Sequence, residues 1–539
     1  MDDKLLPALL LGAYFLLLLG IGVLASRKIK SSEDYILAGR SLGFWVFLLL
    51  LITSICSGVT LIGGSGMGFT YGWPSIWDQI FTPLSAVFCL IFFASKLNRI
   101  GRKKGIVNLE DYFALRYENT RGLRILSSII GILISLVYLV GQYTAVSIVL
   151  VWLFDIPHWQ ALLLAAAIIT AYTTLGGLYA VSWTSVVQGL ILIFGMLVFA
   201  PMIIVYAGGL EHINLVLSSI DPNFVMPYFP EKYAAYAYIT PEIIFSFGLL
   251  LIVGLACAPH VISNVLAVKN PNYFRWIPLI TFGIYIVITM LVRFSGMGVR
   301  ALVEDGVVTL PAVSNAADYS FVYGISAAAG TTVVTGLFAV MLLSAVMSTT
   351  DRLMLTIGTQ FSWNIYKGIL RKNASEKQVI RVSRAVMIAA AIISLLLAIN
   401  PPDVLVFLIF LAIGLMLASY AVPLICGLYW RGATAKGAAA AMLSGLISGG
   451  CLGYYNNFIE PLPMHFSFYA VLISLAAMIL VSLITRKNSQ TALDETCTGW
   501  YIVARPRCGR APPRGALRRH TPHPRKQSVN TDSDDKDRV

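Results

Sequence analysis

Long apolar runs dominate this sequence, and their length restricts the environment in which the chain can fold. A helix needs about 20 mostly apolar residues to cross the hydrocarbon core of a bilayer, and a window of roughly 19 residues detects such helices. About thirteen runs meet this requirement: 5–25, 44–69, 74–95, 123–153, 158–175, 183–209, 241–267, 276–298, 326–362, 378–399, 403–430, 435–455 and 466–485. The sequence therefore predicts an all-α integral membrane protein with about 13 transmembrane helices.

Composition agrees with this prediction and excludes a soluble enzyme. Hydrophobic residues make up 58% of the chain and charged residues 12%, against roughly 25% charged in soluble domains. The sequence contains no catalytic dyad, no cofactor fingerprint and no histidine spacing typical of a metal site. We expect neither an enzyme nor an organic cofactor.

The net charge of +13 has two explanations. It could indicate a nucleic acid or anionic lipid, or it could reflect the excess of lysine and arginine in cytoplasmic loops. Basic residues gather in the loops after odd-numbered spans: Arg27, Lys28, Lys30, Arg40; Arg99, Arg102, Lys103, Lys104, Arg116, Arg121; Lys269, Arg275; Lys367, Arg371, Lys372, Lys377; Arg431 and Lys436. This alternation favours the second explanation, with membrane lipid and no nucleic acid as a partner. It predicts a plasma-membrane protein with its N-terminus outside and its C-terminus in the cytoplasm.

The character of the chain changes after Arg486. Residues 487–539 are basic, rich in proline and poor in aliphatic residues, so they cannot bury a core. We expect a transmembrane domain over residues 1–486, followed by a disordered cytoplasmic tail. The tail either contacts anionic headgroups or has no function of its own, and the second interpretation is simpler.

Two of the expected spans contain interruptions. The second span holds "TSICSG" (53–58) and "GGSGMG" (63–68), which indicate an unwound segment or close helix packing. The seventh holds "GLACAPH" (254–260), in which Pro259 removes a backbone donor. The interruptions lie five spans apart, as in transporters built from inverted repeats. They favour two repeats of five helices, at about 44–209 and 241–430, over two unrelated packing motifs.

The ninth span contains an unusual polar stretch, "SAVMSTTDR" (344–352). Polar and charged side chains are costly inside a membrane and often mark a functional site. By itself, the pair Ser348 and Thr349 could simply bond to carbonyls one turn earlier in the same helix. Ser and Thr oxygens can also coordinate a small hard cation.

Five motifs in order resemble the sodium:solute symporter family, whose members carry proline, pantothenate, sugars, sialic acid and monocarboxylates. They are "SSEDYILAGRSLG" (31–43), "GGLYAVSWTSVVQG" (176–189), "APHV" (258–261), "SAVMSTTD" (344–351) and "VPLICGLYWRGATAKGA" (422–438). The resemblance extends from about Ser31 to Met442. It implies a LeuT-type inverted 5+5 repeat and a secondary active transporter. Such a protein couples sodium to uptake of a small organic solute by alternating access, and we expect it to act as a monomer.

The resemblance also implies a sodium site between the second and ninth spans. Matching by motif assigns it the carbonyls of Thr53, Cys56 and Ala345 and the hydroxyls of Ser348 and Thr349. This set is chemically reasonable, because a broken helix frees carbonyls and neutral oxygens bind a monovalent ion weakly enough to release it.

The expected solute site lies beside the break in the second span. Ser57 and Thr60 lie one turn apart, and Gln79 in the third span adds an amide; in sialic acid relatives the matching positions hold the solute carboxylate. Gln142 is a weaker candidate of the same kind. These groups favour a carboxylate or a zwitterion. Gln79 could instead join a hydrogen bond between helices.

Several positions depart from the family pattern. Ser185 replaces an aspartate that contributes to a second cation site in some relatives, and Ile55, Asn264 and Asn364 replace charged residues found in others. Two alternatives therefore stay open. One is a solute sensor or receptor built on a transporter fold, and the other is a proton-coupled symporter.

Overall fold

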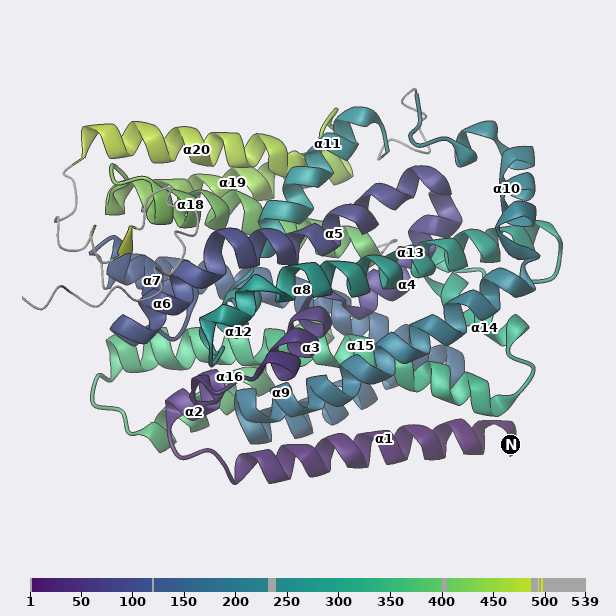
Figure 1. Ribbon diagram of the computed structural model, residues 1–539, viewed down its shortest axis with the longest axis horizontal. Helices are drawn as coiled ribbons and strands as arrows, with labels where there is room; N and C mark the ends of the chain where they lie inside the picture. Colours follow the sequence, from purple (N-terminus) through teal and green to yellow (C-terminus); the bar gives the residue numbers. More distant parts are fainter. Residues whose placement is uncertain are drawn as a thin grey trace, which may run out of the picture. The chain divides into compact units, whose positions relative to one another are not determined.

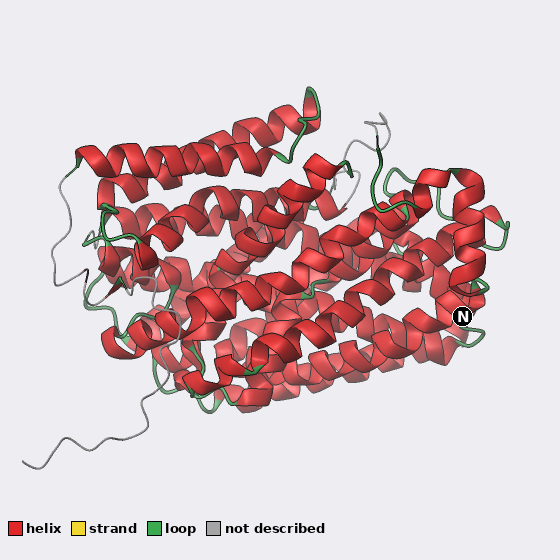
Figure 2. Cartoon of the chain, turned by 45° about the horizontal axis from the view of Figure 1, so that its top comes forward, coloured by secondary structure: helices red, strands yellow, loops and turns green. Residues whose placement is uncertain are grey.

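The computed structural model describes residues 2–118, 121–230, 239–399 and 405–485, together with Leu493, Thr496 and Cys497. The chain divides into two units, Met1–Gly499 and Trp500–Val539, and the second unit lies outside the described residues. Most of the expected tail, 487–539, therefore lies outside them too. Where the chain is described, its regular structure is helical (Figure 2). A single isolated parallel bridge joins Leu42 to Val268.

The α-helices of the described part are α1 Asp2–Ser26, α2 Ser32–Leu37, α3 Phe44–Ile55, α4 Gly58–Tyr71, α5 Ile76–Phe88, α6 Ser95–Lys104, α7 Leu109–Arg116, α8 Gly122–Phe154, α9 His158–Tyr206, α10 Gly209–Ile220, α11 Pro241–Leu249, α12 Pro259–Leu266, α13 Ile277–Glu304, α14 Ser320–Ala328, α15 Thr332–Thr359, α16 Glu376–Leu397, α17 Leu405–Met416, α18 Val422–Tyr429, α19 Ala435–Phe458 and α20 Phe466–Ile484. Shorter 3-10 turns and π-helical stretches are labelled η. Those used below are η2 Trp73–Ser75, η4 Pro222–Val225, η5 Leu250–Gly254, η6 Leu255–Cys257, η9 Gln360–Leu370 and η10 Leu417–Ala421.

The helices agree with the expected number of spans. Among the described residues, ten helices are long and apolar enough to cross a membrane, and two bent pairs raise the number to twelve. α9 has 49 residues, so at 1.5 Å per residue it would be about 74 Å long, more than twice the bilayer core. It is non-helical at Gly177 (φ 51°, ψ −149°). Its two arms correspond to the expected spans 158–175 and 183–209.

The second span is broken where the sequence indicated. α3 ends at Ile55, α4 begins at Gly58, and the two helices meet at a bend of 46°. The glycine-rich stretch 63–68 is helical, so the unwound segment is confined to Cys56 and Ser57. The glycines serve close packing instead: a Cβ on Gly64 would lie 3.1 Å from Val292 of α13.

The seventh span is also broken as predicted. The segment Pro241–Cys257 and α12 meet at a bend of 47°. Pro259 occupies the first turn of α12, where its missing N–H removes no hydrogen bond. Figure 1 shows α1 along one edge of the helix bundle and α19 and α20 along the opposite edge, with α3 and α12 between them. α1, α19 and α20, which lie outside the two expected repeats, are therefore peripheral to the two broken spans.

Candidate functional site

The break after α3 turns a backbone carbonyl away from its usual helical partner. In an unbroken helix the N–H of Ser57 would donate to the carbonyl of Thr53. Here the Ser57 N–H donates to Thr60 Oγ1 at 3.2 Å, while the Thr60 N–H donates to Ser57 Oγ at 3.2 Å. This reciprocal capping box begins α4 and leaves the Thr53 carbonyl available to another helix.

Both hydroxyls of the unusual stretch in α15 reach that carbonyl. Ser348 Oγ lies 3.2 Å and Thr349 Oγ1 3.0 Å from the oxygen of Thr53. Ser348 Oγ also donates to the Ala345 carbonyl at 2.8 Å. All of these side chains are fully buried. The hydroxyl of Thr349 therefore bonds across to α3 rather than back along its own helix.

Cys56 lies at the break itself. It is the first non-helical residue after α3, with φ −77° and ψ 90°. The N–H of Thr60 would meet its carbonyl in a continuous helix, but that N–H caps α4 instead. The fold thus brings Ser348 and Thr349 of α15 to the Thr53 carbonyl, with the Ala345 carbonyl beside Ser348 and Cys56 at the break itself.

A small cavity of about 30 Å³ lies beside the same break. Its lining residues come from both broken spans and from three other helices: Ile55, Thr60, Gly64, Asp78, Gln79, Thr82, Tyr138, Leu251, Leu255, Ile409, Phe410 and Ile413. This volume holds one or two water molecules, so an organic solute requires the cavity to widen. Two of the four predicted solute residues, Thr60 and Gln79, line it.

The other two predicted solute residues do not line the cavity. The hydroxyl of Ser57 caps α4 and lies 3.2 Å from Thr60 Oγ1. Gln142 is fully buried on α8, one turn beyond Tyr138. Within the described residues, neither atom of its amide has a hydrogen-bond partner.

Sequence reasoning missed an ion pair next to the cavity. Arg293 of α13 donates through Nη2 to Oδ1 of Asp78, in the first turn of α5, at 2.5 Å. The Nε2 of Gln79 lies 3.3 Å from the other oxygen of Asp78. Charged residues inside the apolar runs 74–95 and 276–298 were the available signal, since such residues are rare and functional in membranes.

The acidic and basic residues that follow Thr349 have separate partners. Thr173 of α9 donates its hydroxyl to Oδ1 of Asp351 at 2.5 Å. Arg352 donates through Nη2 to the carbonyl of His260 in α12, at 3.1 Å. Arg352 therefore links α15 to the second broken span.

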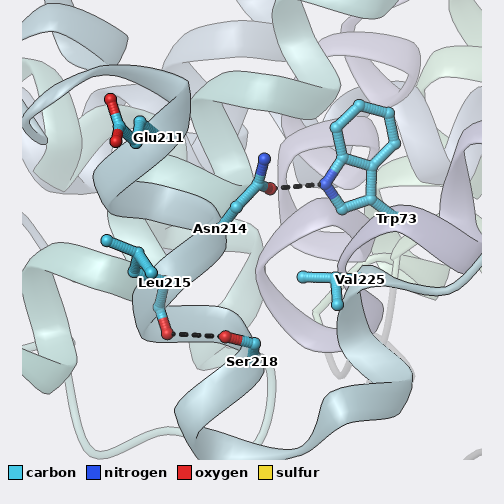
Figure 3. Close-up of a pocket in the computed structure, with 6 residues that line it drawn as sticks. All are labelled: Trp73, Glu211, Asn214, Leu215, Ser218 and Val225. Atoms are coloured by element: carbon cyan, nitrogen blue, oxygen red, sulfur yellow. Dashed lines mark hydrogen bonds between the residues drawn. The ribbon is translucent and has the colours of Figure 1, made fainter.

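A larger hollow lies elsewhere on the surface. Its volume is about 520 Å³, and it is lined by Trp73, Glu211, Asn214, Leu215, Ser218 and Val225. Figure 3 shows the indole of Trp73 donating to Asn214, which joins η2 to α10. The hollow contains none of the predicted sodium or solute residues, so we place the site in the smaller cavity.

A second buried polar cluster surrounds Glu110 and Asp111 of α7, a helix outside the membrane-spanning segments, and its other members lie near the ends of spanning helices. Gln360 of η9 donates to Glu110 at 2.8 Å, and Trp363 donates to Asp111 at 2.9 Å. Arg124 forms an ion pair with Asp111 at 2.9 Å. Burial is the main cause that raises the pKa of Glu110 to about 7.

Stability is expected to depend on pH through Glu110. The unfolded chain releases this proton near pH 4.5 and the folded chain near pH 7, so stability falls as pH rises through that window, by up to about 3 kcal/mol. Glu110→Gln keeps an acceptor for Gln360 and should flatten the decline. Thermal unfolding between pH 5 and pH 8 measures the difference. The matched control Glu211→Gln, at an exposed position of α10, should decline like wild type. An equal decline in Glu110→Gln would contradict this assignment.

Two broken helices that meet at a buried cavity, one of them with a freed backbone oxygen, are typical of secondary transporters. The family model of the sodium:solute symporter family matches residues 35–445. The chain belongs to this family. The resemblance noted in the sequence is thereby confirmed, and the protein is a sodium-coupled symporter rather than an enzyme.

Individual relatives cover most of the chain. It is 24% identical to a sodium/pantothenate symporter of Haemophilus influenzae over 487 aligned residues. The alignment covers 90% of this chain and 96% of the relative. It is 27% identical over 434 residues to the sodium/proline symporter of Escherichia coli, covering 79% of this chain and 84% of the relative.

A solved structure shows the fold. The substrate-bound outward-open state of a Na⁺-coupled sialic acid symporter superposes with a TM-score of 0.72, at 18% identity, covering 90% of this chain and 99% of that chain. The protein therefore has the expected LeuT-type fold.

Proposed function

We propose that sodium binds between α3 and α15 and that a small carboxylate or zwitterion binds in the adjacent cavity. The proposal rests on one observation: the hydroxyls of Ser348 and Thr349 in α15 both lie within hydrogen-bond distance of the Thr53 carbonyl oxygen in α3. The carbonyls of Cys56 and Ala345 complete a five-oxygen site. Sodium bound there holds α3 against α15, and by linkage it raises the affinity for the solute.

The solute contacts follow from the lining of the cavity. Thr60 supplies a hydroxyl and Gln79 an amide. Ser57 lies next to Thr60, and Gln142 lies one turn beyond Tyr138 of the lining. Both take part, in our proposal, once the cavity widens. In our proposal the protein works as a monomer in the plasma membrane, with the basic loops and the C-terminus in the cytoplasm.

The deciding experiment is uptake into proteoliposomes with and without an inward sodium gradient. L-Proline and pantothenate, the solutes in the names of the two relatives, head a panel of small carboxylates and zwitterions. We expect sodium to drive accumulation of at least one. Binding without accumulation would indicate a sensor.

Proton coupling, the alternative that the sequence left open, requires a buried carboxylate near the site, and Asp351 is such a group. This fully buried carboxylate lies two residues beyond Thr349, and in the described part of the chain its Oδ2 has no hydrogen-bond partner. A proton gradient imposed in sodium-free buffer separates the candidates. Sodium coupling predicts no accumulation under that condition.

Gln79→Leu is expected to lower apparent solute affinity by at least tenfold, because one hydrogen bond worth about 1.5 kcal/mol is lost. Apparent sodium affinity should remain unchanged, since Gln79 lies outside the sodium site. Concentration dependence of sodium-driven uptake measures both values. Gln188→Leu, a buried amide of α9 that donates to Tyr14, is the matched control. Unchanged solute affinity in Gln79→Leu would assign the amide to helix packing.

A further inference from the structure

Close packing of α4 and α13 places an arginine next to the cavity wall. A Cβ on Gly296 of α13 would lie 2.0 Å from the carbonyl oxygen of Ser65 in α4. A Cβ on Gly68 would lie 2.4 Å from the carbonyl oxygen of Arg293. These contacts are possible only because both positions lack a side chain. They hold Arg293 against α4, the helix that carries Thr60.

The partner of Arg293 lines the cavity itself. Asp78 is one of the lining residues, and Gln79 follows it. The side chain of Arg293 is fully buried, and that of Asp78 is 6% exposed. Burying a charge pair is costly and gives little stability compared with apolar packing, so its position beside a solute cavity requires another explanation.

Arg293 uses only part of its hydrogen-bonding capacity in this pair. Its Nη2 donates to Asp78. Among the described residues, none accepts a hydrogen bond from its Nε or Nη1, and the Oε1 of Gln79 has no donor. Unused donors on a buried guanidinium favour an anionic partner, and the planar guanidinium matches a carboxylate in particular.

We infer that the Asp78–Arg293 pair determines the solute specificity of this transporter: Arg293 binds the carboxylate of the solute, and Asp78 orients the guanidinium toward the cavity. The inference rests on the proposed function and narrows the solute to compounds that carry a carboxylate. Thr60 and Gln79 contact the remaining polar groups. When the cavity widens, the unused N–H groups of Arg293 donate hydrogen bonds to the oxygens of the solute carboxylate.

A purely structural role makes a different prediction. The pair could simply join α5 to α13. These helices are already joined one turn away, where Thr289 donates to the backbone carbonyl of Gln79 at 3.1 Å. If the pair only joins helices, replacing both charges with neutral side chains should leave solute binding intact.

The test uses the full-length purified protein and its thermal stabilisation by matched probes. L-Proline and pantothenate carry a carboxylate, whereas L-prolinamide and panthenol lack it. For wild type in NaCl we expect stabilisation by at least one of the two carboxylates and none by its neutral analogue. The inference would be overturned if the neutral analogues stabilised the protein as much as the carboxylates, or if only the neutral analogues did. It would also be overturned if none of the four probes stabilised the protein.

The variants separate binding from folding. Arg293→Gln alone leaves Asp78 buried without its partner and is expected to destabilise the protein. The double variant Asp78→Asn/Arg293→Gln removes both charges and should fold. We expect it to keep sodium stabilisation and to need at least tenfold more carboxylate, the loss expected for one charge-assisted hydrogen bond. Arg300→Gln, which removes a partly exposed charge from the same helix, should behave like wild type. Wild-type carboxylate affinity in the double variant would refute the inference.

Probe stabilisation in NaCl and KCl, together with uptake into proteoliposomes, distinguishes failure of the inference from failure of the proposed function. One outcome would contradict symport but not the role of Arg293: wild type binds carboxylates equally in NaCl and KCl, no gradient drives uptake, and the double variant still binds carboxylates more weakly. If sodium drives uptake equally in wild type and the double variant, symport stands and the role of Arg293 fails.

Discussion

Replacing Ser348 and Thr349 together with alanine is expected to lower apparent sodium affinity by about 100-fold. Each substitution removes one oxygen ligand, and a tenfold loss for each corresponds to about 1.4 kcal/mol. Both hydroxyls lie within 3.2 Å of the Thr53 carbonyl, so the variant removes the contacts between α15 and α3 that the proposed ion requires. The sodium dependence of solute uptake into proteoliposomes measures the effect.

Ser344→Ala is the matched control for this variant. Ser344 is a buried serine of the same helix, but its hydroxyl donates to the Val340 carbonyl, within α15, at 2.7 Å. We expect wild-type sodium affinity in this control. Wild-type sodium affinity in the Ser348/Thr349 double variant would instead show that sodium binds elsewhere.

Gly58→Ala is expected to have a comparably large effect through packing alone. Gly58 begins α4, and a Cβ there would lie 2.0 Å from Cγ2 of Val346 and 3.1 Å from its Cα. The helices must separate to accommodate it, which costs about 1–3 kcal/mol of stability. Because the same separation moves α15 away from the break, we expect at least a tenfold loss of sodium affinity. Thermal unfolding and sodium titration of uptake measure the two effects.

The neighbouring valine provides a rescue for this variant. Val346→Ala removes Cγ2, the atom closest to the added methyl group, and leaves the Cβ at 2.8 Å. The double variant Gly58→Ala/Val346→Ala should therefore recover part of the lost stability and sodium affinity. If Gly58→Ala alone retains both, the close approach of α4 to α15 does not hold the site together.

Sequence alone predicted the fold because the spans and their breaks depend on local signals, whereas the residues of the proposed sodium site came from the family resemblance. A run of about 20 apolar residues forms a spanning helix whatever it packs against. Proline in "APHV" and the hydroxyl-rich "TSICSG" interrupt their helices where they occur, and the structure has breaks at Ala258 and at Cys56. The glycines of 63–68 indicated either an unwound segment or close helix packing. The contacts of α4 with α13 show that they allow close packing.

The solute site was less predictable, since its members come from helices far apart in the chain. Ser57 and Thr60 were expected to share one role, but the cap of α4 uses the Ser57 hydroxyl while Thr60 also lines the cavity. Gln142 was chosen for its residue type, and it lies one turn away from the cavity lining.

By itself, the sequence determined that this protein spans a membrane and where two of its helices break. Periodicity, length and helix-breaking residues act over a few neighbours, so these properties can be inferred without a fold. The tertiary structure alone decided that Asp78 meets Arg293, 215 residues away, beside the cavity that Thr60 lines. An ion pair between distant helices depends on how those helices pack, and packing is a property of the whole bundle.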